Sequence, residues 1–161
     1  MVGKSDCRKF LCVVDDSEEL EAALLYAAKR AKFTGGKVAL FYCVEPKQFQ
    51  HWVGVGRIME QEAEEDAQMH VDNAAKYIRS ITGEEPIQYI RNGKIEEELL
   101  AILSDPSEGI STLVLAIGSA KEGPGPLITQ FISKRSVNLP VPVALVPQHL
   151  SAEEIDNVTG V

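Results

Sequence analysis

The sequence lacks the cysteine pairs that a metal knuckle or a disulfide-linked fold requires. Its three cysteines, Cys7, Cys12 and Cys43, stand singly, with no C-x-x-C pair among them. Cys12 and Cys43 fall inside apolar runs, which is typical of buried free thiols. The sequence also has no signal-peptide pattern and no apolar run long enough to span a membrane. These absences predict a protein of the reducing cytoplasm that does not have a membrane as a partner.

Basic residues are also in deficit. The chain has 16 lysines and arginines against 24 aspartates and glutamates, which gives a formal net charge of -8. Nucleic acids and anionic membranes are bound through basic patches, so this charge argues against both as partners. The length of 161 residues suits one domain with a sheet covered on both faces. We predict a single domain over residues 1–161, with a core at about 8–147 and a polar, loose tail after His149.

Apolar runs of strand length alternate with helical patterns along the chain. The runs are at residues 10–14, 38–44, 87–90, 113–117 and 141–146, and the helical patterns are at 20–31, 58–81, 95–103 and after residue 126. Continuous apolar runs are typical of parallel strands buried on both faces. The alternation predicts an α/β fold with an open, doubly wound parallel sheet in the order 3-2-1-4-5 and helices on both faces. Prolines bracket the last run, which predicts an edge strand.

The longest helical pattern and the loop before it carry distinct signals. The pattern over residues 58–81 predicts a helix with an inward stripe of Ile58, Met59, Ala63, Ala67, Val71, Ala74, Ala75 and Ile78. The preceding loop, from Glu45 to Arg57, is long and holds Phe49, His51 and Trp52. A bare aromatic patch would be unusual on a protein surface. We therefore predict that the Phe49–Trp52 segment contacts a protein partner, a dimer mate or a ligand.

Two turns at the ends of strands suggest where a ligand binds. Asp15 follows the first strand, and a segment rich in glycine and proline, residues 118–126 (the Gly-Pro loop), follows the fourth. Loops of this kind before a helix cradle phosphate, although Gly and Pro often mark only a surface loop. In the predicted sheet both turns face one crevice between strands 1 and 4. A carboxylate opposite a phosphate cradle suits a nucleotide.

Other chemistry receives little support from the sequence. Glu62, Asp66 and His70 are spaced four residues apart on the predicted helix, which is a spacing that can hold a metal. Their charged surroundings favour a solvated stripe instead, so we predict no metal site. No Ser-His-Asp or Cys-His order appears in a supporting context, and we predict no catalytic residue.

Several motifs, taken in order, resemble the universal stress protein family. They are CVVDDS at residues 12–17, FYCVEP at 41–46, Gly93 before an acidic helix, LAIGS at 115–119 and LPVPVALV at 139–146. The resemblance covers roughly residues 8–147. It implies the fold predicted above, a homodimer formed partly through the last strand, and in many members ATP or AMP bound in the crevice. The apolar edge from Val141 to Val146 by itself also favours pairing with a second copy.

The resemblance also implies site residues. Val13, Val14 and Asp15 match positions that contact adenine and ribose, Cys43 matches a position that touches the base, and Ile117 and Gly118 match the start of the phosphate loop. That loop follows the pattern G-x2-G-x9-G-[ST] in members that bind nucleotide.

This chain departs from that phosphate-loop pattern. Lys121 or Glu122 stands where the second glycine is expected, and the later Gly-Ser pair is absent. The loop offers Gly123 and Gly125, each flanked by proline, and its nearest hydroxyls are Thr129 and Ser133. Pro124 and Pro126 remove two amide donors.

Three interpretations of function follow from these residues. The first is a regulatory stress-response module that binds an adenine nucleotide, ATP or AMP. The second is a nucleotide-free dimeric scaffold of the same fold. The third is an ATP-consuming enzyme, which ranks last because phosphoryl transfer needs a base and metal ligands that the sequence does not supply beyond Asp15.

Overall fold

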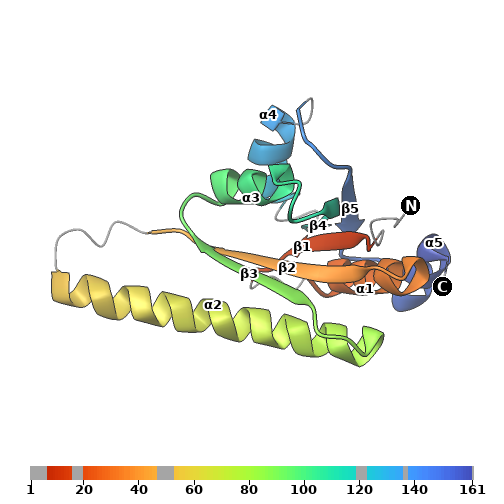
Figure 1. The fold of residues 1–161 in the computed structure, drawn as a ribbon, viewed down its shortest axis with the longest axis horizontal. Helices are drawn as coiled ribbons and strands as arrows, with labels where there is room; N and C mark the ends of the chain where they lie inside the picture. The colour runs from red at the N-terminus through yellow and green to blue at the C-terminus, as the bar shows by residue number, and fades with distance from the viewer. Residues whose placement is uncertain (1–6, 16–19, 47–52, 119–122, 136–137, 161) are drawn as a thin grey trace.

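The computed structural model describes residues 7–15, 20–46, 53–118, 123–135 and 138–160. These residues form a five-stranded parallel sheet in the order β3-β2-β1-β4-β5 (Figure 1). The strands are β1 (Lys9–Val13), β2 (Lys37–Val44), β3 (Ile87–Asn92), β4 (Ile110–Ile117) and β5 (Val143–Pro147). The predicted α/β fold and the predicted strand order are both confirmed.

Helices cover both faces of the sheet. They are α1 (Leu20–Thr34), α2 (Val53–Thr82), α3 (Ile95–Ser104), the π-helical η1 (Leu127–Ile132), the short α4 (Ser133–Arg135) and α5 (Ala152–Thr159). Side chains of α1, α2 and α5 form one core with one face of the sheet, and those of α3 and η1 form a second core with the other. Strand β1 supplies both cores in alternation, with Phe10 and Cys12 in the first and Leu11 and Val13 in the second.

Helix α2 begins earlier than the sequence pattern predicts. It starts at Val53, so Gly54, Gly56 and Arg57, which were predicted to belong to a loop, are helical. A glycine costs a helix only about 1 kcal/mol, and a helix of 30 residues continues beyond it. The aromatic segment Phe49–Trp52 lies outside the described residues, and its contact with a partner stays a prediction.

The C-terminal tail, predicted to be loose after His149, is instead the helix α5. A capping box begins it, because the Ser151 hydroxyl accepts from the Glu154 amide at 3.2 Å and the Glu154 carboxylate accepts from the Ser151 amide at 2.7 Å. Ile155 and Thr159 are each only 1% exposed, and α5 packs on α1. The prediction failed because the tail is polar on average, whereas Ile155 and Thr159, four residues apart, lie on one face of the helix and are buried.

Strand β5 pairs only with β4 and is an edge strand, as its prolines predict. It runs from Val143 to Pro147, whereas the sequence predicts Val141 to Val146. Pro142 has no amide hydrogen to donate to β4, and the strand begins at the next residue. Its carbonyl still accepts a hydrogen bond from the Leu113 amide at 2.9 Å.

Candidate functional site

The carboxyl ends of β1 and β4 lie side by side at the point where the chain changes direction across the sheet. The helix after β1 packs on one face, and η1, which follows β4, packs on the other. Crevices at such switch points are where doubly wound sheets bind ligands. A cavity of about 450 Å³ lies there, which is within the roughly 300–1,000 Å³ range of small-molecule sites.

The cavity brings together residues from distant parts of the sequence. Val13, Val14 and Asp15 line it from the end of β1, Cys43 lines it from β2, and Gly123 and Gly125 line it from the Gly-Pro loop. These six were all predicted as site residues, and the structure places them around one space. Asp15 is exposed, and it is the one charged side chain in the described lining of this cavity.

Four other predicted site residues do not line the cavity. Ile117 is the last residue of β4, Gly118 follows it, and both are half-buried. The Thr129 hydroxyl donates to the carbonyl of Gly125 at 3.1 Å, so it is already engaged with the loop that precedes its helix. Ser133 is exposed at the start of α4. Residues 119–122, which include Lys121 and Glu122, lie outside the described part of the chain.

Cys43 is held in place in its protonated form. Its thiol donates to the Gly93 carbonyl at 3.3 Å. Burial, with smaller contributions from the Glu45 and Glu98 carboxylates, raises the pKa of the Cys43 thiol to about 11. A thiol with this pKa is a poor nucleophile at neutral pH, so Cys43 contributes shape and a weak polar contact rather than covalent chemistry.

The described part of the Gly-Pro loop depends on its glycines for backbone conformation. Gly123 has φ of 79° and Gly125 has φ of 100°, and a Cβ added at either position would meet no heavy atom within 4 Å. These glycines are therefore required by dihedral angle rather than by space. The Thr129 amide donates to the Gly125 carbonyl at 3.1 Å, so the helix follows the loop directly.

Some residues of the cavity were not predicted as site residues. Tyr42, Ile95 and Leu115 are among them, and each comes from a different element. Tyr42 lies beside Cys43 near the carboxyl end of β2, and Ile95 begins α3 just after the Gly93 turn. Tyr42 and Ile95 lie at the ends of elements that face the crevice, and this position was the sequence signal that could have identified them as site residues. Because these residues fall in apolar patterns, the sequence assigned them to the core.

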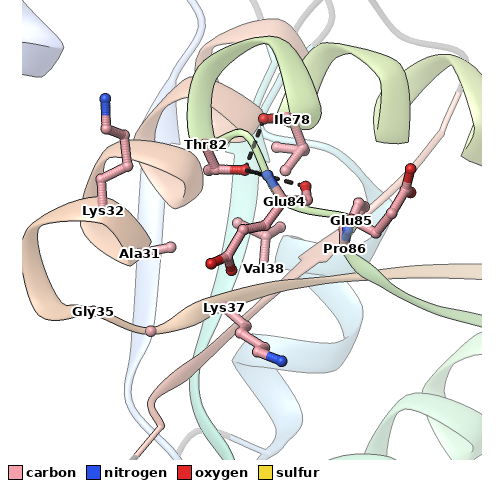
Figure 2. Close-up of a pocket in the computed structure, with 11 residues that line it drawn as sticks. Ala31, Lys32, Gly35, Lys37, Val38, Ile78, Thr82, Glu84, Glu85 and Pro86 are labelled. Atoms are coloured by element: carbon pink, nitrogen blue, oxygen red, sulfur yellow. Dashed lines mark hydrogen bonds between the residues drawn. The ribbon is translucent and has the colours of Figure 1, made fainter.

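A second hollow, of about 250 Å³, lies at the opposite end of the sheet, where β2 and β3 begin (Figure 2). Thr82 organises one wall, because its hydroxyl donates to the Ile78 carbonyl and accepts from the Glu84 amide. The side chains of Lys32 and Lys37 extend in different directions from this hollow, as Figure 2 shows. The two ammonium groups therefore do not converge on one point, and the hollow is a junction between α1, α2 and the starts of β2 and β3.

Glu62, Asp66 and His70, the three residues spaced four apart, lie on helix α2. His70 stacks on Tyr42, with ring centroids 5.9 Å apart and an interplanar angle of 5°. Within the described residues, no group of three or more His, Cys, Asp or Glu side chains is placed to hold a metal ion. Among the helices in these same residues, none is long and apolar enough to cross a membrane.

The fold and the cavity define an α/β domain of the Rossmann-like class, with a ligand crevice at its switch point. Within this class, the chain belongs to the universal stress protein family, whose family model matches residues 7–147. Helix α5 lies outside the residues that this family model matches. A comparison with curated proteins finds no match.

Solved structures of this family share the fold at low sequence identity. Universal stress protein UspA from Lactobacillus plantarum is 16% identical, with a TM-score of 0.66 over 86% of this chain and 97% of that one. The Archaeoglobus fulgidus universal stress protein in complex with dAMP is 15% identical, with a TM-score of 0.62 over 87% and 97%. A universal stress protein in complex with cAMP is 11% identical, with a TM-score of 0.59 over 88% and 98%.

Proposed function

We propose that this protein is a stress-response regulatory module that binds an adenine nucleotide, ATP or AMP, between β1 and β4. One observation carries the proposal: a cavity at the switch point with the Asp15 carboxylate and the backbone of Gly123 and Gly125 among its walls. The complexes of two structural relatives with dAMP and cAMP support an adenine nucleotide as the ligand class.

The lining suggests a role for each part of the cavity. The Asp15 carboxylate accepts hydrogen bonds from ribose hydroxyls or from a base amine. Apolar side chains such as Val13 and Leu115 contact the base. The backbone of Gly123 and Gly125 can approach a phosphate closely because neither residue has a side chain. Binding of this kind orients a nucleotide without acting on it chemically.

A nucleotide-free scaffold is the second candidate, and one observation favours it. The described lining of the cavity contains the Asp15 carboxylate and neither lysine nor arginine. Among the described residues, a polyphosphate there meets backbone dipoles and a nearby negative charge but no cationic side chain, which weakens its binding. On this ground we expect AMP to bind at least as tightly as ATP.

The test is a calorimetric titration of ATP, AMP and GTP into the wild-type protein, Asp15→Ala and Asp15→Asn. Asp15→Ala removes a charge-assisted hydrogen bond and is expected to cost about 1 to 3 kcal/mol of binding free energy. Asp15→Asn keeps an acceptor and is expected to recover part of that loss. If no nucleotide binds the wild type at millimolar concentration, the scaffold becomes the preferred function.

Gly125→Ala and Gly109→Ala form a matched pair for the loop. Both glycines have positive φ, at 100° and 64°, and both have open space around an added Cβ. Only Gly125 lines the cavity. We expect similar losses of stability and a loss of nucleotide affinity in Gly125→Ala alone. Equal affinity in the two variants would place the ligand elsewhere.

We also propose that the protein is a homodimer joined along β5. This strand is at the edge of the sheet, and Leu145 on it is 41% exposed. An apolar edge strand of this kind is prone to pair with another chain. Leu145→Asp is expected to yield a folded monomer by light scattering and circular dichroism. A folded dimer in this variant would contradict the interface.

A cytoplasmic location belongs to the same proposal. All three cysteines are free, and Cys12 is fully buried. Protein thiols persist in reduced form in the cytoplasm. Fractionation of the native cells followed by detection of the protein in the soluble fraction tests this location.

A further inference from the structure

Helix α2 is packed along only part of its length. Its 30 residues span about 45 Å. Among the side chains of α2 that the structure describes, from Met59 onward, the buried ones begin at residue 67, and they are Ala67, Val71, Ala74, Ala75 and Ile78. Figure 1 shows the N-terminal part of α2 extending past the body of the domain. Between Met59 and Asp66 the side chains are exposed, except for the half-buried Ala63.

A groove runs between this part of α2 and the end of β2. It encloses about 1,020 Å³, and we call it the α2 groove. Its apolar surface includes Met59, Met69 and the stacked rings of Tyr42 and His70. Met59 is 42% exposed and Met69 is 49% exposed. Exposed methionines are flexible and polarisable, so they adapt to apolar partners of varied shape.

The rim of the α2 groove is acidic. Glu45, Glu62, Glu65 and Asp66 line it, and no lysine or arginine does so among the described residues. The chain as a whole carries a formal net charge of -8. A second copy of this chain that met the groove with its own α2 groove would be repelled, as would an anionic ligand. Charge complementarity therefore requires a cationic occupant.

We infer that the α2 groove is a docking site for a basic, amphipathic helical segment of a partner protein. Apolar side chains of the segment would contact Met59 and Met69, and its lysines or arginines would pair with the carboxylates of the rim. The helix rises about 16 Å between Met59 and His70, which matches about three turns of a partner helix. A small cation would leave the exposed methionines uncovered.

The groove borders the cavity proposed for a nucleotide. Tyr42, Cys43, Ile95 and Pro126 line both. The docking inference does not depend on nucleotide binding, and its test is run without nucleotide. Failure of one proposal therefore leaves the other standing.

The probe is a fluorescein-labelled synthetic peptide of about 14 residues, in which leucines occupy one helical face and lysines the other. Its binding to the full chain is followed by fluorescence anisotropy. Two control peptides accompany it: one with the lysines replaced by glutamates, and one with the leucines and lysines scrambled so that no apolar face forms. We expect only the amphipathic basic peptide to bind with saturation. Equal binding of the scrambled peptide, or no binding of the amphipathic peptide, would overturn the inference.

A charge-matched pair of protein variants tests the position of the site. Glu62→Lys/Glu65→Lys reverses two charges on the rim, whereas Glu60→Lys/Glu64→Lys reverses two exposed charges of the same helix outside the groove lining. The first is expected to weaken peptide binding by about 10-fold or more and the second by about 2-fold or less. Equal weakening by both would show a general attraction to net charge and would refute the groove.

A neutral variant separates the apolar contribution. Met59→Ser/Met69→Ser leaves the charge unchanged and alters side chains that are already exposed, so the fold is expected to persist. Peptide binding should weaken by about 10-fold, since two apolar contacts are lost. Unchanged affinity in this variant would also count against the α2 groove as the site.

Discussion

The two halves of α2 differ in what surrounds them, although the sequence pattern is continuous across both. In the C-terminal half, Val71 and Ile78 are buried against the sheet and α1. In the N-terminal half, Met59 continues the same predicted stripe but is 42% exposed. An amphipathic sequence pattern therefore identifies a helix, but it does not show how much of the helix packs against the rest of the domain. One half of α2 stabilises the domain, and the other presents a surface.

The largest expected effect comes from truncating one side chain in each half. Ile78→Ala removes a side chain that is 1% exposed and should lower the free energy of unfolding by about 3 kcal/mol. Met59→Ala should stay within about 0.5 kcal/mol of the wild type, because the methionine side chain is already exposed. Urea unfolding with equal m-values measures both changes. A Met59→Ala loss close to that of Ile78→Ala would show that the N-terminal half is packed in solution.

A smaller effect is expected from glycine replacements at the two ends of α2. Gly83 follows the helix with φ of 75°, and its amide donates to the Arg79 carbonyl at 2.9 Å. Gly83→Ala should cost about 1 kcal/mol, because a side chain disfavours the left-handed conformation. Gly56 is inside the helix, so Gly56→Ala should not destabilise the protein, since alanine is the better helix former. Thermal unfolding compares the two, and losses of equal size would argue against helix at residue 56.

The smallest expected effect is on the stability of the protein at alkaline pH, and it involves Tyr77 in the packed C-terminal half of α2. Burial, followed by the nearby Glu21 carboxylate, raises the pKa of the Tyr77 phenol in the folded protein. The folded state therefore favours the neutral phenol, and this contribution to stability is complete below the unfolded pKa of about 10 and lost as pH rises above it.

Tyr77→Phe should therefore make stability fall less steeply above about pH 10. Urea unfolding at a series of pH values measures the slope. Some dependence of stability on pH will remain in Tyr77→Phe because of Tyr89. Burial and its 2.6 Å hydrogen bond to Glu108 raise the pKa of Tyr89 to about 12. An unchanged slope in Tyr77→Phe would show that Tyr77 has no part in it.

The candidate site was predictable in part for a clear physical reason. Asp15 and Gly125 are 110 positions apart, yet each follows a strand, and parallel strands place their carboxyl ends at one edge. Tyr42 and Ile95 were missed because an apolar residue that lines a cavity has the same sequence pattern as one in the core. Thr129 was assigned to the site as a nearby hydroxyl, but its hydrogen bond to the Gly125 carbonyl depends on helix geometry.

Local sequence by itself predicted the five strands, their order in the sheet and the helices α1 to α3, but it did not predict α5. Apolar runs of strand length separated by helical periods leave few topologies, because parallel crossovers are right-handed and buried strands must be covered on both faces. The tertiary structure alone decided which surfaces remain open: that α5 packs on α1, and that the first half of α2 extends beyond the sheet. Whether an apolar residue is buried depends on neighbours far away in the sequence, and no local pattern contains them.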